Sequence, residues 1–155
     1  MDTVGNCIHH IYRLCGNEFA ATDIASQIIS AYGLSATLYD IDEIRSAWHR
    51  LLNFIAERHG AARALHHERP FIMHKEGKAY SGSIDLTATV ADGLVLIDFK
   101  TCPLGNDRIL DEDNAHFAGV YGGQLDCYRQ ALQTSGHHVV ATYLYYPISG
   151  LIAEL

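Results

Sequence analysis

Two aspartates and a lysine stand in two neighbouring segments that have the pattern of β-strands. Asp98 and Lys100 are two residues apart within residues 94–101, so their side chains point to the same face of that strand. Asp85 lies thirteen residues before Asp98, in a segment where apolar and polar residues alternate. Carboxylates are ligands that Mg²⁺ prefers, and a lysine beside them can polarise a water or stabilise negative charge. The combination indicates metal-assisted hydrolysis of a phosphodiester bond.

The turn between these two strands decides whether the three side chains meet. Asp92-Gly93 is a strong signal for a tight hairpin. A two-residue turn would place Asp85 opposite Lys100, whereas a four-residue turn would place it opposite Asp98; both bring the three groups to one face. A three-residue loop would put Asp85 behind the sheet, and we expect an even-length turn. The alternative to a functional site is a structural ion pair, which is costly to bury.

The elements that must position these residues follow from periodicity. Helices are expected near residues 2–15, 18–32 and 41–59, the third one starting at an Asp40/Glu43 capping box and ending at Gly60. After Pro70 the pattern predicts strands at 71–74, 83–90 and 94–101. A polar loop over 102–117, a helix over 120–133 and a strand over 139–146 follow.

This order of elements predicts an α/β fold. A central hairpin, joined through a helical crossover to a parallel strand, makes a mixed β-sheet flanked by helices. We expect a single domain over residues 1–155, with a helical part over 1–65 and a catalytic αβ core over 66–155.

Composition excludes several other classes of protein. Eleven basic and eighteen acidic residues give a net charge of −7, the wrong sign for a protein that coats nucleic acid, although a small metal site could still hold one phosphate. The four cysteines form no C-x-x-C pair, which argues against a zinc ribbon or an iron–sulfur site. No apolar run is long enough for a membrane span, and the first residues do not resemble a signal peptide, so a soluble, cytoplasmic protein is expected.

Four short motifs occur in a fixed order along the chain: GNCIH at residues 5–9, GSID at 82–85, DFKT at 98–101 and QLDCY at 124–128. This set resembles the G-x-x-x-H, G-x-x-D, D-x-K-T and Q-x-x-x-Y motifs of the RecB-like nucleases in the PD-(D/E)XK superfamily. That group includes the nuclease domains of RecB and AddA helicase–nucleases. Each motif alone is weak, whereas the ordered set is specific and spans nearly the whole chain.

The resemblance implies a restriction-endonuclease-like fold and a set of site residues. Asp85 and Asp98 would bind Mg²⁺, for which Mn²⁺ can substitute, and His9 and the Phe99 carbonyl would be further ligands. Lys100 would be the catalytic lysine. The corresponding reaction is in-line attack of a metal-activated water, which leaves a 5′-phosphate and a 3′-hydroxyl.

Gln124 and Tyr128 lie at i and i+4, hence on one helical face. Within the resemblance they would join the catalytic set and orient the phosphate or Lys100, while an ordinary amphipathic helix is the other interpretation. His10 is the rival of His9 as a ligand. Glu68 resembles an acid that often precedes the first strand in the family, and both a supporting position near the metal and a structural role are open.

These observations lead to a functional hypothesis and two alternatives. The hypothesis is a Mg²⁺-dependent deoxyribonuclease acting on single-stranded DNA or linear ends, as the exonuclease domain of a helicase–nuclease in double-strand-break repair and recombination. No phosphate-binding loop of a helicase motor occurs in this chain, so a helicase domain of the same longer chain and a partner subunit are expected, although a stand-alone relative is also consistent. The alternatives are an inactive module for DNA-end binding or protein docking, and a histidine-rich transition-metal binder.

Overall fold

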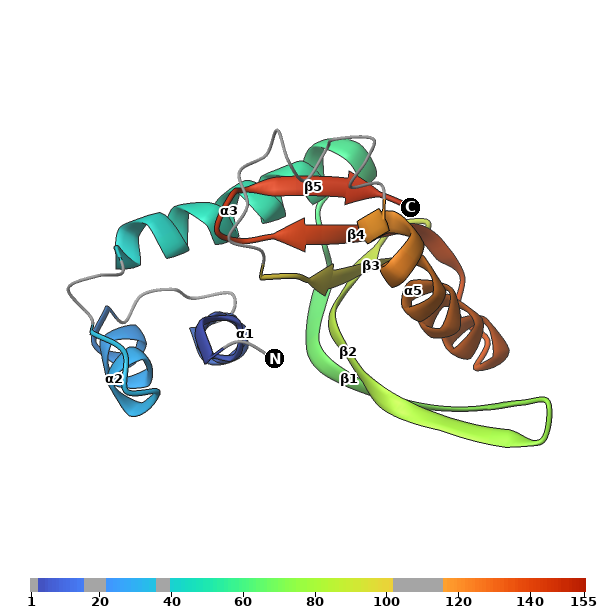
Figure 1. Cartoon of the computed structure of the whole chain (residues 1–155). Coiled ribbons are helices and arrows are strands. Elements are labelled where there is room, and N and C mark those ends of the chain that lie inside the picture. Colours follow the sequence, from blue (N-terminus) through green and yellow to red (C-terminus); the bar gives the residue numbers. More distant parts are fainter. Residues whose placement is uncertain (1–2, 16–21, 36–39, 102–115) are drawn as a thin grey trace.

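The computed structural model describes residues 3–15, 22–35, 40–101 and 116–155. Within these ranges the chain forms helices and one five-stranded mixed sheet (Figure 1), which confirms the predicted α/β architecture. The polar loop expected over residues 102–117 lies almost wholly outside the described residues. In the described ranges, no helix combines the length and the apolar character that crossing a membrane would require.

Three helices precede the sheet: α1 (Thr3–Cys15), α2 (Thr22–Ala31) and α3 (Ile41–His59). The predicted limits of α3 are confirmed. The carboxylate of Asp40 accepts hydrogen bonds from the backbone N–H groups of Asp42 and Glu43, and Gly60 ends the helix at a φ of +82°.

The sheet has the strand order β1-β2-β3-β4-β5. Strands β1 (Ala64–Lys75), β2 (Lys78–Val90) and β3 (Gly93–Phe99) are antiparallel neighbours. Helix α5 (His116–Thr134) then leads to β4 (Val139–Tyr146), which pairs with β3 in parallel, and β5 (Leu151–Glu154) pairs antiparallel with β4. The predicted hairpin, crossover and parallel strand are therefore all present.

Three boundaries differ from the predictions. Strand β1 begins at Ala64 rather than after Pro70, because an edge strand tolerates a proline whose missing N–H would face away from the ladder. Helix α5 begins at His116, before the predicted residue 120. Strand β5 was not predicted, since its four residues carry too short a pattern to distinguish from a loop.

Helices cover both faces of the sheet, so the core has two parts. Helices α1 and α3 pack on one face, with α2 against these two helices, around buried residues such as Tyr12, Trp48 and Ile97. Helix α5 packs on the other face, where Leu125 and Leu132 meet sheet residues that include Leu96 and Leu144. A strand in the middle of this sheet is buried on both sides, which is why β3 is almost continuously apolar.

The β1–β2 hairpin is longer than the rest of the sheet and curves away from it (Figure 1). Its tight turn at Glu76 and Gly77 uses positive φ angles of 52° and 73°. Side chains near the tip are exposed, including Ile72 and Tyr80. The part of the hairpin nearer the sheet carries the acids of the site described next.

Candidate active site

A cavity of about 460 Å³ opens where the middle of β2 and the end of β3 meet helices α1 and α5. All seven site residues expected from the sequence line it, and so do six further residues. The expected ones are His9, Asp85, Asp98, Phe99, Lys100, Gln124 and Tyr128, and the others are Asn6, His10, Arg13, Tyr32, Glu68 and Ser83.

The β2–β3 register brings the two aspartates to this cavity. Val90 pairs with Gly93, so the turn spans residues 90–93 and has an even length, as expected. Of the two even registers, the structure has the one that sets Asp85 across from Asp98, one step beyond the Leu86–Ile97 pair. The version that paired Ala91 with Leu94 and set Asp85 opposite Lys100 is wrong.

Strand β2 twists at Asp85. Ile84 and Leu86 are two residues apart and would share a face in a regular strand, yet Ile84 packs under α5 whereas Leu86 packs under α1 to α3. Asp85 stands between them, at the point where β2 turns away from β3. Its carboxylate can therefore reach across the end of β3, where it accepts a 2.7 Å hydrogen bond from the N–H of Phe99.

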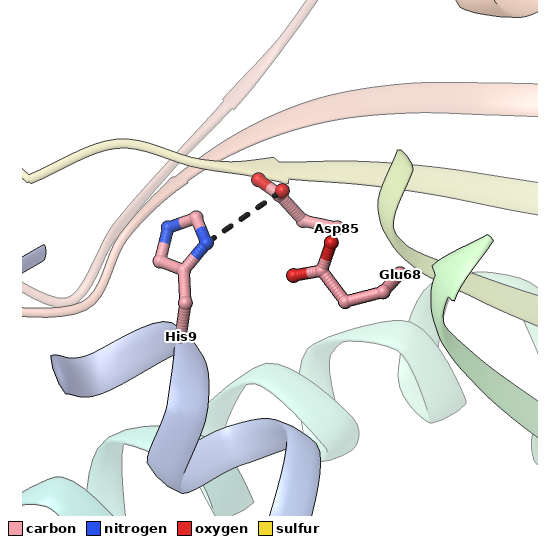
Figure 2. A group of neighbouring side chains, drawn as sticks. All are labelled: His9, Glu68 and Asp85. Carbon is pink, nitrogen blue, oxygen red and sulfur yellow. Dashed lines mark ion pairs between the residues drawn. The ribbon is translucent and has the colours of Figure 1, made fainter. Parts of the chain in front are cut away.

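Three side chains gather at the α1 end of the cavity, and we call them the acid cluster: His9, Glu68 and Asp85 (Figure 2). One ligand atom of each lies within 4.8 Å of those of the other two. Nδ1 of His9 is 3.6 Å from Oδ1 of Asp85. Of the two histidines that competed in the sequence, His9 faces the acids, while Nδ1 of His10 is 3.4 Å from the hydroxyl of Tyr32.

Glu68 joins the acid cluster through an irregularity in β1. The ladder pairs His67 with Leu86 and Arg69 with Ile84, but Glu68 between them has a φ of +49°. That value is uncommon for a residue with a long side chain, and it is typical of strained positions at functional sites. The hydroxyl of Ser83 donates a 2.8 Å hydrogen bond to Oε2 of Glu68, which holds the carboxylate in place.

Helix α1 can hold His9 over the cavity because it lies very close to the end of β3. A Cβ atom at Gly5 would overlap Oγ1 of Thr101 and lie 3.1 Å from its Cβ. Gly5 is one helical turn before His9, and the ring of His9 meets that of Phe99 edge-on at 5.3 Å. Close packing therefore explains the glycine of the first motif, since a larger residue at position 5 would push α1 and His9 away from the end of β3.

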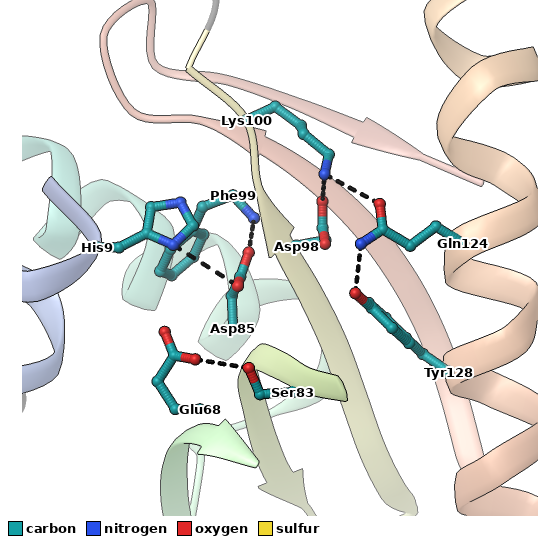
Figure 3. A network of polar contacts seen from close by, with 9 residues as sticks. All are labelled: His9, Glu68, Ser83, Asp85, Asp98, Phe99, Lys100, Gln124 and Tyr128. Carbon is teal, nitrogen blue, oxygen red and sulfur yellow. Dashed lines mark hydrogen bonds and ion pairs between the residues drawn. The ribbon is translucent and has the colours of Figure 1, made fainter. Parts of the chain in front are cut away.

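The other end of the cavity holds a chain of contacts that we call the lysine network: Asp98, Lys100, Gln124 and Tyr128 (Figure 3). Nζ of Lys100 is 2.7 Å from Oδ2 of Asp98 and donates a 3.1 Å hydrogen bond to Oε1 of Gln124. The amide of Gln124 in turn donates to the hydroxyl of Tyr128. Of the helical pair at i and i+4, Gln124 contacts Lys100 directly, and Tyr128 is linked to Lys100 through Gln124.

Burial and mutual repulsion shift the titration of the acids. Burial raises the pKa of Asp85 to about 7, and the negative charge of Asp98 adds to this shift. Burial also raises the pKa of Asp98, against the opposing effect of Lys100. The pKa of His9 is lowered by burial, so its ring is largely neutral and available as a ligand at neutral pH.

These features fit a divalent cation. One nitrogen and several carboxylate oxygens form a donor set suited to Mg²⁺ or Mn²⁺, and a cation would offset the cost of ionising Asp85. Asp98 adds a buried carboxylate oxygen, Oδ2. This atom forms an ion pair with Lys100, but it accepts no hydrogen bond from a described residue. Glu68, open to two interpretations in the sequence, lies within the acid cluster, which favours a position near a metal.

Comparisons with known proteins do not assign the chain to a family. No family model and no curated protein matches it. Among solved structures, that of SSO0001 aligns with 99% of this chain at 18% identity and a TM-score of 0.36. The chain spans 62% of the length of that structure.

Proposed function

We propose that this chain is a metal-dependent deoxyribonuclease that uses Mg²⁺, or Mn²⁺ in its place. The observation that carries the proposal is the meeting of Asp85, Asp98 and Lys100 at one cavity, with His9 added from helix α1. A nitrogen, several carboxylates and a fixed ammonium together match the requirements of phosphodiester hydrolysis better than those of a structural ion pair.

The acid cluster and Asp98 would hold the cation, with the backbone of Phe99 beside them. A bound cation would neutralise the scissile phosphate and lower the pKa of the attacking water. The residues of the chain orient this centre: Phe99 fixes the carboxylate of Asp85, and Ser83 fixes that of Glu68. Both acids are therefore preorganised for a ligand.

Lys100 supplies positive charge at a defined place. An ammonium group has three N–H donors. One donor of Lys100 is directed to Gln124, and the charged group also forms an ion pair with Asp98. A remaining donor would serve an attacking water or a phosphate oxygen. The ring of Tyr121 lies 4.3 Å from Nζ, which adds a favourable cation–π contact and restricts the side chain further.

The proposal extends to the context of the reaction. A net charge of −7 gives little long-range attraction for DNA, so the remainder of the strand would be held elsewhere. A helicase domain in the same longer chain and a partner subunit would supply that grip, and the domain would act as the exonuclease of a helicase–nuclease in double-strand-break repair and recombination.

The test is degradation of single-stranded and linear duplex DNA by the purified protein with Mg²⁺. Asp98→Ala and Lys100→Ala should each lower the rate by about 10³-fold or more. Lys78→Ala, at an exposed lysine on the distant hairpin tip, is the matched control and should leave the rate unchanged. Equal rates in wild type and in both site variants would refute the assignment.

Calorimetric titration with Mg²⁺ or Mn²⁺ separates the nuclease from its rivals. A docking module that keeps only the fold need not bind either ion. A histidine-rich transition-metal binder would take up Zn²⁺ with an affinity that does not depend on Asp85 or Asp98, whereas the proposed site loses its metal when these acids are changed.

A further inference from the structure

One wall of the cavity has no part in the acid cluster or the lysine network. Helix α1 contributes Asn6, His10 and Arg13 to this wall, and Tyr32 follows the end of α2. Of these four, only His10 was considered from the sequence, as the rival of His9 as a ligand. We name them the α1 wall.

The spacing along α1 places three of its polar side chains in one row. Asn6, His9 and Arg13 lie at i, i+3 and i+7, so they share a helix face. Arg13 is about 6 Å further along the axis than His9, at 1.5 Å per residue. One helix face therefore carries a candidate metal ligand and, about one turn further along, a cationic group.

Two side chains of the α1 wall, Arg13 and Asn6, have polar groups that no described residue engages. Arg13 is exposed, and within the described ranges it forms no ion pair, in contrast to Lys100 at the same cavity. Asn6 likewise makes no side-chain hydrogen bond to a described residue. His10 and Tyr32 differ, because they contact each other with ring centroids 5.9 Å apart.

The charge balance of the cavity indicates what these donors can bind. Three acids, Glu68, Asp85 and Asp98, line it together with two cations, Lys100 and Arg13. Lys100 is committed to Asp98 and Gln124, so Arg13 is the cation available for a second anionic group. A guanidinium with free N–H groups suits a phosphate, because its donors match two phosphate oxygens at once.

We propose that Arg13, assisted by Asn6, is a positioning residue that holds the phosphate next to the scissile one in a single DNA strand. This inference rests on the proposed nuclease function and adds a second subsite to it. The strand would run along α1, with one phosphate at the acid cluster and its neighbour at the guanidinium. Binding the neighbour sets the register of the strand and leaves the chemical step to the other residues.

The experiment compares a substrate that has a neighbouring phosphate with one that lacks it. Oligothymidylate has such a phosphate, whereas bis(4-nitrophenyl) phosphate contains a single diester. For Arg13→Gln, kcat/KM on oligothymidylate should fall about tenfold, mainly through KM, and kcat/KM on the small diester should stay unchanged. Arg13→Lys should recover part of the loss, since it keeps the charge but not the paired donors.

Arg63→Gln is the matched control, because Arg63 is also exposed but lies just before β1, outside this cavity. It should behave as wild type on both substrates. An equal loss on both substrates, or no loss with oligothymidylate, would overturn the role of Arg13.

A binding measurement keeps this inference separate from the nuclease proposal. Fluorescence anisotropy with labelled oligothymidylate in Ca²⁺ should show about tenfold weaker binding for Arg13→Gln than for Arg63→Gln. The slope of log affinity against log salt concentration should be less steep by about 0.7 for Arg13→Gln than for Arg63→Gln, because one phosphate contact is lost. If wild type cleaves neither substrate, the nuclease proposal fails, while unequal binding by the two variants would still support the subsite and equal binding would overturn it.

Discussion

The two ends of the cavity balance their charges differently. In the lysine network, Asp98 has Lys100 at 2.7 Å, and the contacts continue through Gln124 to Tyr128. In the acid cluster, no described lysine or arginine forms an ion pair with either carboxylate. Their neighbour there is His9, and burial keeps its ring largely neutral at neutral pH. Among the described residues, the carboxylate at one end is paired with an ammonium group, and the carboxylates at the other end have no paired cation.

This contrast would allow the proposed site to bind a cation and to keep a lysine beside it. If Lys100 also neutralised Asp85 and Glu68, little affinity for a metal would remain. Asp98 stands between the two ends, since it pairs with Lys100 and also lines the cavity with the acids. The following predictions test whether the two ends have separate roles.

The largest expected effect is on metal affinity. Glu68→Gln and Asp85→Asn should each weaken Mn²⁺ binding by about 100-fold, because each removes a charged candidate ligand. Gln124→Ala should leave the affinity within about twofold of wild type, since Gln124 reaches the site only through Lys100. Isothermal titration calorimetry measures all three, and a comparable loss in Gln124→Ala would show that the two ends are not separable.

The next effect concerns stability without metal. The pKa of Asp85 is about 7 in the folded chain, against about 3.9 for an unfolded aspartate, so the folded state binds the proton more tightly. The free energy of unfolding of the metal-free protein should therefore fall as pH rises from about 4 to about 7, by on the order of 2–4 kcal/mol from this group.

Asp85→Asn removes this titration. Its metal-free unfolding free energy, from urea titrations at several pH values, should change less between pH 4 and pH 7 than that of wild type. At neutral pH the variant should be the more stable protein without metal. If the unfolding free energy of wild type changes with pH between 4 and 7 in the same way as that of Asp85→Asn, the predicted charge imbalance in the acid cluster is contradicted.

A smaller effect tests how His9 is positioned. Gly5→Ala should destabilise the protein by about 1–3 kcal/mol and weaken Mn²⁺ binding, because the new methyl group overlaps Thr101 and pushes α1 outward. Adding Thr101→Ala removes the overlapping hydroxyl and should restore most of both losses. Thermal unfolding and calorimetry of the two single variants and the double variant form a cycle, in which strictly additive losses would exclude this contact as the cause.

The smallest effect lies at the far end of the lysine network. Tyr128→Phe removes the oxygen that accepts from the Gln124 amide, which loosens Gln124 and, through it, Lys100. We expect kcat to fall by about tenfold or less, with Mn²⁺ affinity unchanged. Steady-state kinetics on linear DNA give the first quantity. A change in metal affinity alone would instead place Tyr128 with the acid cluster.

Much of the fold and of the site follows from local patterns. The capping residues around α3 and the alternation in β3 are local, so they predict the helix limits and put Asp98 and Lys100 on one face. The parity of the β2–β3 turn is also local, although its exact register is not. Asp92 and Gly93 favour a two-residue turn centred on themselves, but the observed turn is centred one residue earlier and leaves Gly93 in β3, where a Cβ would overlap the carbonyl of His138.

The remaining features depend on tertiary structure. Nothing in the local sequence indicates that Glu68 has a positive φ or that β2 twists at Asp85, because both arise from the way the hairpin curves around the sheet. The α1 wall depends on how α1 and α2 pack together. Arg13 and Tyr32 carry no signal by themselves, since an arginine and a tyrosine in helical segments are ordinary surface residues.

The most direct measurement is the position of a metal ion in crystals grown with Mn²⁺. An anomalous difference map should show a peak in the cavity, within coordination distance of the His9 ring and the Asp85 carboxylate. A saturating Mn²⁺ concentration that gives no peak there, or peaks only at exposed histidines, would contradict the claim that the uncompensated end of this cavity is a metal centre.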